Sequence, residues 1–155
     1  GGTWTADRES TIATLAVGYA DGWSRLYVPG AHAVVRGRRV PLVGRVSSDA
    51  VAVDVTDIDG FGAEDELTLL DGDGGASAGG DRAPSVEDLA ELRYSIAWDV
   101  LDSFSPRLSR VYVEQGVPVA VRSLDGVTRL ASSFALQLAP RHDAGPDWGG
   151  GLLRR

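Results

Sequence analysis

The amino-acid sequence predicts a mainly β fold, a partly open barrel of Greek-key character with one or two short helices at about residues 85–104. Short runs rich in β-branched residues recur between turn residues, as at 11–17 and 40–46, and this pattern is typical of strands. Residues 51–55 alternate valine with smaller or polar residues, as in a strand with one face in water. Helical spacing is confined to residues 85–104, so helices are expected to be a minor part of the fold.

The first half of the chain is expected to be a series of strands joined by turns. The turn after the first strand contains Asp21, which can accept hydrogen bonds from backbone N–H groups, and Gly22, which can adopt a left-handed conformation. Gly37 marks the turn of a β-hairpin. Strands are expected at residues 11–17, 32–36, 39–43, 50–55 and 66–70.

The two helices are expected after a glycine-rich, acidic stretch at 71–83. We expect this stretch to be a surface loop, because the lysine and hydroxyl residue of a phosphate-binding loop do not follow it. Ser85 is the predicted N-cap of the first helix, and Asp88 three residues later completes an approximate capping box. The second helix, at about 96–104, ends before Pro106.

Short strands are expected again after the helices. Glycine-containing turn pairs at 115–116 and 125–126 join three of them. Alternating apolar residues then predict one more strand. These strands are expected at residues 110–113, 117–122, 127–130 and 134–138.

Composition argues against several classes of protein. The net charge is −7 and the arginines are scattered, which argues against a nucleic-acid partner. No apolar run approaches the ~20 residues of a membrane helix, so no membrane association is expected. The absence of cysteine is compatible with the predicted cytoplasmic location. His32 and His142 lack partners at the spacing of metal ligands or of a catalytic triad, so no metal site is expected.

The sequence contains neither methionine nor lysine, and all 15 of its Lys and Arg residues are arginine. Without an initiator methionine, the chain is expected to be a fragment or a processed product. Without a lysine amine, it cannot form the Schiff base that a pyridoxal-phosphate enzyme requires.

Two motifs carry a specific resemblance to a known family. Residues 18–25 (GYADGWSR) and 41–49 (PLVGRVSSD) resemble the C-terminal domain of alanine racemases, whose members carry GYADG(Y/W)xR and P(I/L)VGR(V/I)xMD at this spacing. Further similar blocks follow in the same order. They lie at residues 65–70, 85–90, 95–99 and 107–112.

The resemblance implies a domain organisation. Residues 1–112 are expected to form the alanine racemase C-terminal domain, with the partly open barrel of that family. Residues 113–139 are expected to add strands that continue the same domain. Residues 140–155 are expected to be a disordered tail.

The resemblance also implies an activity for the full-length enzyme, the interconversion of L- and D-alanine, which serves D-alanine biosynthesis for peptidoglycan. The cofactor would be pyridoxal 5′-phosphate, held by a lysine in an N-terminal barrel domain absent from this chain. The second catalytic base would be a tyrosine immediately before Gly1. This chain would therefore contain no catalytic residue, would bind no cofactor covalently and would be inactive alone. The full-length protein would be a head-to-tail homodimer that acts on a small amino acid.

Four residues match the family's substrate entrance. Tyr19 is expected to narrow the entrance to the partner subunit's active site, and the next layer would contain Arg25, Arg45 and Ile96. A positively charged corridor attracts an amino-acid carboxylate. The alternatives are a tyrosine at a strand end, arginines in surface salt bridges and an isoleucine of the core.

Ser48 and Asp49 are the expected substrate-binding positions. Ser48 stands where the family has methionine, whose backbone N–H meets the substrate carboxylate, and Asp49 is expected to orient this loop. Trp98 stands where the family has a tyrosine that binds the cofactor phosphate, and its indole can donate a hydrogen bond but cannot accept one. The departures at Ser48 and Trp98 leave room for a racemase of a different amino acid.

An alternative from another class is a non-catalytic β domain for association or regulation, derived from a racemase. A decarboxylase of the same fold type is disfavoured, because those enzymes use a cysteine in this domain and the chain has none.

Overall fold

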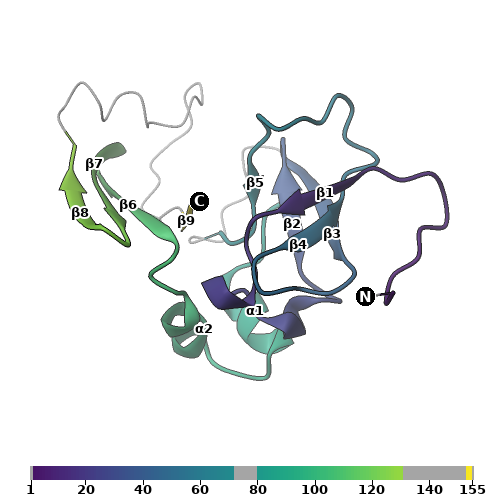
Figure 1. Cartoon of the computed structure of the whole chain (residues 1–155), viewed down its shortest axis with the longest axis horizontal. Coiled ribbons are helices and arrows are strands. Elements are labelled where there is room, and N and C mark those ends of the chain that lie inside the picture. Colours follow the sequence, from purple (N-terminus) through teal and green to yellow (C-terminus); the bar gives the residue numbers. More distant parts are fainter. Residues whose placement is uncertain (1, 72–79, 131–152, 155) are drawn as a thin grey trace. The chain divides into compact units, whose positions relative to one another are not determined.

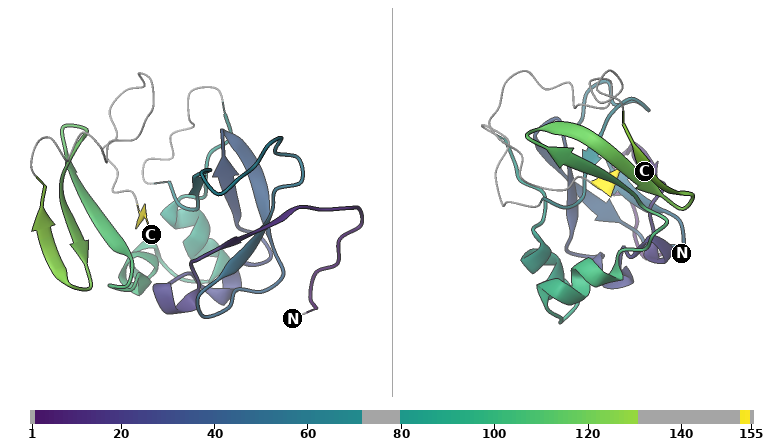
Figure 2. Two further views of the ribbon diagram at one scale, coloured as in Figure 1. Left: turned by 45° about the horizontal axis from the view of Figure 1, so that its top comes forward. Right: turned by 90° about the vertical axis from the view of Figure 1, so that its left-hand side faces the viewer.

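The computed structural model describes residues 2–71, 80–130 and 153–154 (Figure 1). The chain divides into two compact units, Gly1–Ser105 and Pro106–Arg155. Strands predominate in both units, and the described residues contain two α-helices, α1 and α2 (Figures 1 and 2). The prediction of a mainly β fold with short helices is therefore confirmed.

The first unit is built on a five-stranded antiparallel sheet with the strand order β1-β4-β3-β2-β5. The sheet curls into half of a barrel (Figure 2). The last strand is shorter than predicted, because only Val34 and Val35 of β2 pair with it. The strands are β1 (Ile12–Leu15), β2 (His32–Val35), β3 (Arg38–Val43), β4 (Val51–Asp54) and β5 (Leu67–Thr68).

The core of the first unit lies under β4, which has the alternation that the sequence predicts. Val51 and Val53 are 1% and 0% exposed, whereas Ala52 and Asp54 are half-buried. Burying a valine side chain fully contributes roughly 1.5–3 kcal/mol, so this strand holds its neighbours β1 and β3 on one hydrophobic face. Other buried side chains of the unit include Val35, Val40, Leu42, Val43, Val55, Leu89 and Val100.

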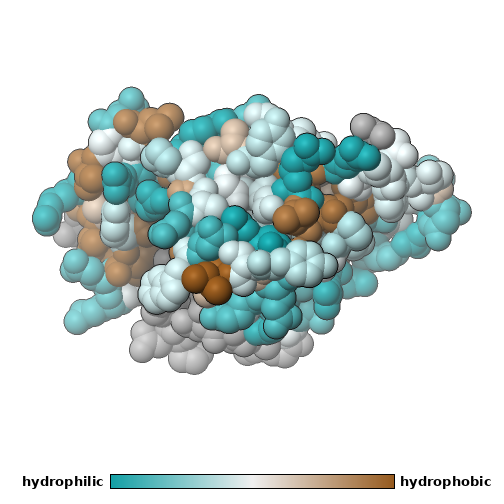
Figure 3. Space-filling view, turned by 90° about the horizontal axis from the view of Figure 1, so that it is seen from below, coloured by the Kyte–Doolittle hydropathy of each residue, from teal (hydrophilic) through white to brown (hydrophobic). Residues whose placement is uncertain are grey.

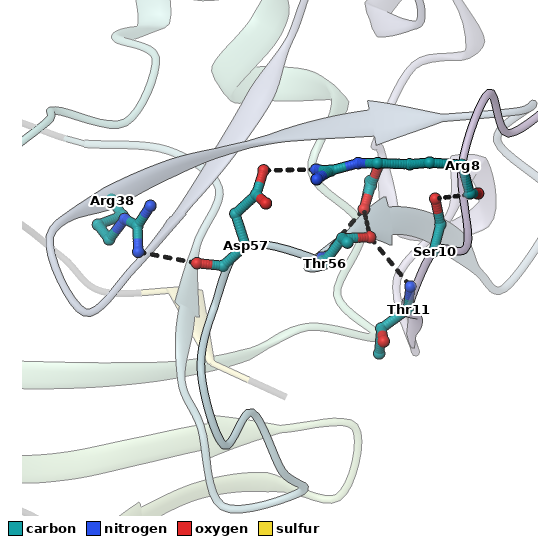
Figure 4. A network of polar contacts seen from close by, with 7 residues as sticks. Arg8, Ser10, Thr11, Arg38, Thr56 and Asp57 are labelled. Carbon is teal, nitrogen blue, oxygen red and sulfur yellow. Dashed lines mark hydrogen bonds and ion pairs between the residues drawn. The ribbon is translucent and has the colours of Figure 1, made fainter.

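Polar contacts fix the chain on either side of β1 and β4 (Figure 4). The Arg8 guanidinium forms an ion pair with Asp57 at 2.7 Å, and the Thr11 N–H donates to Thr56 Oγ1 at 3.0 Å. Arg38 of β3 donates to the Asp57 carbonyl at 2.8 Å. The segment before β1 and the segment after β4 are thus held together and to β3.

The two α-helices are α1 (Val86–Leu92) and α2 (Ala97–Ser103). The predicted capping box of α1 is confirmed, since Ser85 Oγ accepts the Asp88 N–H at 3.2 Å and the Asp88 carboxylate accepts the Ser85 N–H at 2.8 Å. The hydrogen bond from the Ser85 N–H lowers the pKa of Asp88, and the positive charge of the nearby Arg82 lowers it further. The second helix falls within the predicted range, with Ile96 as its N-cap.

Two short 3-10 helices lie in the loop after β1. The first covers Tyr19–Asp21 and the second covers Arg25–Tyr27. Ser24 caps the second, because its Oγ accepts the Leu26 N–H at 3.2 Å. These elements place the residues of the GYADGWSR motif on tight turns.

The second unit contains an antiparallel sheet with the strand order β8-β7-β6-β9. Gln115 and Gly116, with φ of 49° and 77°, form the predicted turn between β6 and β7. The strands predicted at 110–113, 117–122 and 127–130 correspond to β6, β7 and β8. The strands are β6 (Ser109–Glu114), β7 (Val117–Ser123), β8 (Gly126–Arg129) and β9 (Leu153–Arg154).

The strand predicted at 134–138 lies outside the described residues, as does most of the predicted tail at 140–155, apart from β9. The division into residues 1–112, 113–139 and 140–155 stays a prediction. Across the described residues, no helix has both the length and the apolar composition needed to cross a membrane.

Candidate active-site wall

Two loops far apart in the sequence meet at one end of the first sheet. One follows β1, and the other follows β3. The Tyr19 N–H donates to the Ser47 carbonyl at 3.0 Å, and the Ala20 N–H donates to the Ser48 carbonyl at the same distance. The predicted site residues Tyr19 and Ser48 therefore lie on adjoining loops, and we call residues 18–22 and 44–49 together the paired loops.

Gly18 is required by the close approach of the paired loops. A Cβ at this position would lie 2.4 Å from the carbonyl oxygens of both Ser47 and Ser48, a distance that no side chain tolerates. The backbone of the GYADG motif can therefore lie against the second loop only because its first residue is glycine.

Asp21 holds the first of the paired loops in shape. Its side chain is fully buried, and its carboxylate accepts the Gly18 N–H at 2.9 Å. Gly22 adopts the left-handed conformation with φ of 100°. Both observations confirm what the sequence predicts for this turn, in which Asp21 has a structural role.

The second of the paired loops presents a backbone donor. Ser47 closes the turn, since its Oγ accepts the Ala50 N–H at 3.0 Å. Ser48 is half-buried and Asp49 is exposed. No hydrogen bond of the Ser48 N–H is found within the described part of the chain, so this group is available to an acceptor such as a carboxylate.

Arg45 lies beside the N-terminal segment. It lines a pocket of about 260 Å³ together with Trp4, Pro29 and Leu42, among others. The Arg45 side chain is exposed. Arg25, at the start of the second 3-10 helix, is also exposed, and the pocket does not include it.

The remaining two predicted site residues lie at the start of α2. Ile96 is 64% exposed and Trp98 is 72% exposed, so neither belongs to the core of this unit. Tyr19 is 51% exposed. The face shown in Figure 3 mixes strongly hydrophobic with hydrophilic residues. Exposed large side chains of this kind fit a surface that another part of a protein covers.

Arg93, at the end of α1, binds two side chains of α2, one of which lies against the first of the paired loops. Its guanidinium forms an ion pair with Asp99 of α2 at 2.8 Å and donates to Ser103 Oγ at 3.1 Å. Ser103 Oγ in turn lies 2.7 Å from the Val100 carbonyl and 3.3 Å from the Gly22 carbonyl, and its single proton can serve either acceptor. The helix that carries Ile96 and Trp98 is therefore tied by polar contacts to the loop that carries Tyr19.

Two buried aromatic residues lie in the segment that follows the first paired loop. The rings of Trp23 and Tyr27 pack edge to face with centroids 4.8 Å apart, and both side chains are almost completely buried. Burial raises the pKa of the Tyr27 hydroxyl, and the positive charge of Arg93 partly opposes this effect. These two rings anchor the segment in the core of the first unit.

A larger hollow lies elsewhere in the first unit. It has a volume of about 630 Å³ and is lined by His32, Arg39, Asp88 and Glu91, among others. His32 Nε2 lies 2.9 Å from the Arg82 carbonyl, and burial lowers the pKa of this imidazole. No predicted site residue lines this hollow, and the part of the chain that the structure describes holds no group of three potential metal ligands. His142 lies outside the described residues.

Comparison with known proteins assigns the family. Residues 1–112 match the family profile "Alanine racemase, C-terminal domain". The chain belongs to this family. A curated alanine racemase from Sorangium cellulosum (strain So ce56) is 45% identical over 114 residues, which are 74% of this chain and 30% of the relative. The resemblance noted from the GYADGWSR and PLVGRVSSD motifs is thereby confirmed.

Solved alanine racemases show the same fold as this alanine racemase C-terminal domain. The structure from Bacillus anthracis with bound L-Ala-P is 32% identical, with a TM-score of 0.66 over 77% of this chain and 28% of that one. The structure from Bartonella henselae, described as having covalently bound pyridoxal phosphate, is 27% identical, with a TM-score of 0.52 over 66% of this chain and 26% of that one. The chain spans less than a third of the length of these relatives.

The sequence pattern did not indicate the contacts of Arg93 with α2. Its partners Asp99 and Ser103 lie on the next helix, and no local motif links them. The one available signal is that an arginine ends α1 while α2 begins with an acidic first turn.

Proposed function

We propose that this chain is the C-terminal domain of a pyridoxal-phosphate-dependent alanine racemase and supplies the substrate entrance and the carboxylate contact to the active site of a partner subunit. The observation that supports the proposal is the pair of backbone hydrogen bonds between the paired loops, so that Tyr19 and Ser48 lie on adjoining loops. Tyr19 would narrow the entrance, and Arg25, Arg45 and Ile96 would form its next layer.

The chain's own residues would act on the substrate by binding and orientation. The Ser48 N–H would donate to the substrate carboxylate, with Asp49 beside it in the same loop. The positive charges of Arg25 and Arg45 would raise the rate at which an anionic group reaches the entrance. Holding the substrate in one orientation lowers the entropic part of the reaction barrier.

Pyridoxal phosphate would contact this chain at Trp98. This side chain is 72% exposed, and its indole N–H is a donor of the kind that a phosphate accepts, so the residue present fits a non-covalent contact. The chain has no lysine, so it would not attach the cofactor covalently. When bound, the cofactor supplies the electron sink that stabilises a carbanion at the α-carbon.

The test is a racemase assay of the full-length gene product. We expect L-alanine with pyridoxal phosphate to lose optical rotation in polarimetry, and the isolated 155-residue chain to give no turnover under the same conditions. Turnover by the isolated chain would contradict the division of labour proposed here. Size measurement of the full-length protein tests the expected head-to-tail homodimer, and cell fractionation tests the expected cytoplasmic location.

The second candidate function is a racemase for a different amino acid, or a non-catalytic association domain. It is favoured by Ser48 and Trp98, which depart from the family's methionine and tyrosine. Racemase assays of the full-length protein with a panel of amino acids separate these possibilities. Faster turnover of a larger amino acid supports the former, and no turnover of any member of the panel supports the latter.

A further inference from the structure

The C-terminal end of α2 contacts the first of the paired loops. The Ser105 N–H donates to the Asp21 carbonyl at 3.0 Å, and Ser103 Oγ lies 3.3 Å from the Gly22 carbonyl. The loop bonds to the second paired loop through other groups, two backbone N–H donors. It is therefore held from two parts of the chain at once, and we call residues 103–105 the support segment.

Gly22 is required by the close approach of the support segment. A Cβ at this position would lie 2.3 Å from the Ser103 carbonyl oxygen and 2.7 Å from the Phe104 Cα. Both are backbone atoms, which cannot rotate away as the end of a side chain can. Any side chain at Gly22 would therefore push the loop and the support segment apart.

The support segment is itself fixed within the first unit. Ser103 Oγ accepts a hydrogen bond from the Arg93 guanidinium at 3.1 Å, and Phe104 is buried. Asp21 is 0% exposed, so water does not reach its carbonyl to replace the Ser105 N–H. Removing this donor leaves a buried acceptor with one partner fewer, which costs free energy.

Tyr19 lies in the same turn as the residues that contact the support segment. It begins the 3-10 helix that ends at Asp21. The Gly22 N–H donates to the Tyr19 carbonyl at 3.1 Å, and the Asp21 N–H donates to the Gly18 carbonyl at 3.0 Å. Because these bonds close the turn on itself, a displacement at Asp21 or Gly22 also displaces Tyr19.

We propose that the support segment is a positioning element for Tyr19, in which the Ser105 N–H and the bare backbone of Gly22 set how far the tyrosine ring narrows the substrate entrance. The size of the amino acid that enters then depends on residues that do not touch it. The inference rests on the proposed function, since it assigns the support segment a role in the specificity of the same entrance.

A pair of substitutions at Ser105 isolates the N–H donor. Ser105→Pro removes this N–H, whereas Ser105→Ala removes the same hydroxyl and keeps it. Phe104 has φ of −67° and ψ of 117°, an extended conformation that suits the residue before a proline. The two variants therefore differ chiefly in the hydrogen bond to Asp21.

The first measurement is the ratio of kcat/KM for L-valine to kcat/KM for L-alanine in the full-length protein. We expect the ratio to rise about two- to tenfold in Ser105→Pro, the range that one hydrogen bond contributes to an equilibrium, and to stay near the wild-type value in Ser105→Ala. A loss of folded protein would lower both kcat/KM values by one factor and leave their ratio unchanged. An unchanged ratio in Ser105→Pro would overturn the proposal.

A double substitution tests whether the effect passes through Tyr19. Tyr19→Ala removes the ring, so adding Ser105→Pro to it should leave the ratio at the value of Tyr19→Ala alone. A further rise of the size seen in the wild-type background would show that the support segment acts by another route, and the assignment to Tyr19 would then be wrong.

Hydrogen exchange of the 155-residue chain separates this proposal from the proposed function, because it needs no substrate. The amides of Tyr19 and Ala20 donate to the second paired loop, and we expect them to exchange about two- to tenfold faster in Ser105→Pro than in Ser105→Ala. Equal exchange would overturn the proposal even in an active racemase. Faster exchange in a protein that racemises no amino acid would support the positioning of Tyr19 and overturn the proposed function, together with the size limit that rests on it.

Gly22→Ala tests the contact from the side of the loop. It should raise the valine-to-alanine ratio at least as much as Ser105→Pro, because the loop must move away from the Ser103 carbonyl. Gly60→Ala is the matched control, since Gly60 also has a positive φ, 61°, but no atom lies within 4 Å of its Cβ. Circular dichroism checks folding, and the Ser105 pair decides alone where Gly22→Ala does not fold. A folded Gly22→Ala with the same ratio as Gly60→Ala would contradict the proposal.

Discussion

The two units of this chain use arginine in different ways. In the first unit, Arg8, Arg36, Arg82 and Arg93 each form an ion pair. In the second, Arg122 and Arg129 lie on an exposed sheet face without one in the described part of the chain. The contrast indicates that these four arginines support the fold of their own unit, whereas Arg122 and Arg129 leave their charges in solvent.

The two units also differ in how their cores are made. The first has a continuous set of buried valines under a curled sheet, with its motif loops bonded to each other. Among the described residues of the second, the buried side chains are Leu108 and Pro118. The family match ends at residue 112, so most of the second unit lies beyond the part shared with the racemase family.

The largest expected loss of stability in the first unit comes from a substitution that forces the paired loops apart. Gly18→Ala places a Cβ at 2.4 Å from two carbonyl oxygens and should lower the free energy of unfolding by about 3 kcal/mol or more. Gly62→Ala is the control, because no atom lies within 4 Å of its Cβ, and its effect should be small. Denaturant unfolding measures both, and equal effects would show that the contact is not tight.

Replacing an ion-paired arginine of the first unit tests whether its charge supports the fold of that unit. Arg93→Gln removes the ion pair with Asp99 and disturbs the bond to Ser103, and it should cost about 1–2 kcal/mol of unfolding free energy. Hydrogen exchange in α2 should rise at the same time, because the helix loses the side chain that ties it to the end of α1. Unchanged exchange in α2 would show that Arg93 does not position it.

Acid is expected to weaken the first unit. The Arg36 hydrogen bond, with the Gly62 N–H, lowers the pKa of Asp65 below its usual 3.8, so its contribution to stability is present above about pH 3.8 and is lost as the pH falls through the folded-state pKa. Burial lowers the pKa of His32 from 6.5, so stability begins to fall below about pH 6.5. Unfolding curves from pH 7 to 3 measure both effects, and Asp65→Asn should reduce the lower step, to which the lowered pKa values of Asp57 and Asp88 also contribute.

An arginine-to-glutamine substitution in the second unit should change the free energy of unfolding least. Arg122→Gln removes a like charge opposite Arg110 and should leave the stability unchanged or raise it by up to about 0.5 kcal/mol. The measurement is the same unfolding experiment as for Arg93→Gln. A loss as large as that for Arg93→Gln would erase the distinction between the two units.

Local features of the sequence predicted local features of the structure. The capping box of Ser85 and Asp88 and the turn of Asp21 and Gly22 depend on residues within a few positions of each other, so their chemistry could be inferred from spacing alone. The alternation in β4 was equally direct, because strand periodicity is two.

Contacts between distant segments could not be inferred in this way. Gly18 meets Ser47 and Ser48 across some thirty positions, and residue patterns alone show no reason for the first to be glycine rather than alanine. The tie from Arg93 through Ser103 to Gly22 depends on the packing of α2 beside the loop. Family resemblance indicated which residues share a site, whereas only the structure shows what holds them.

The central claim is that the paired loops present the Ser48 N–H to a substrate carboxylate. The most direct measurement is KM for alanine of the full-length protein with Ser48→Pro, which removes the N–H, beside Ser48→Ala, which keeps it. With both variants folded by circular dichroism, we predict that KM rises about tenfold or more for Ser48→Pro and changes little for Ser48→Ala. An unchanged KM in Ser48→Pro would contradict the account.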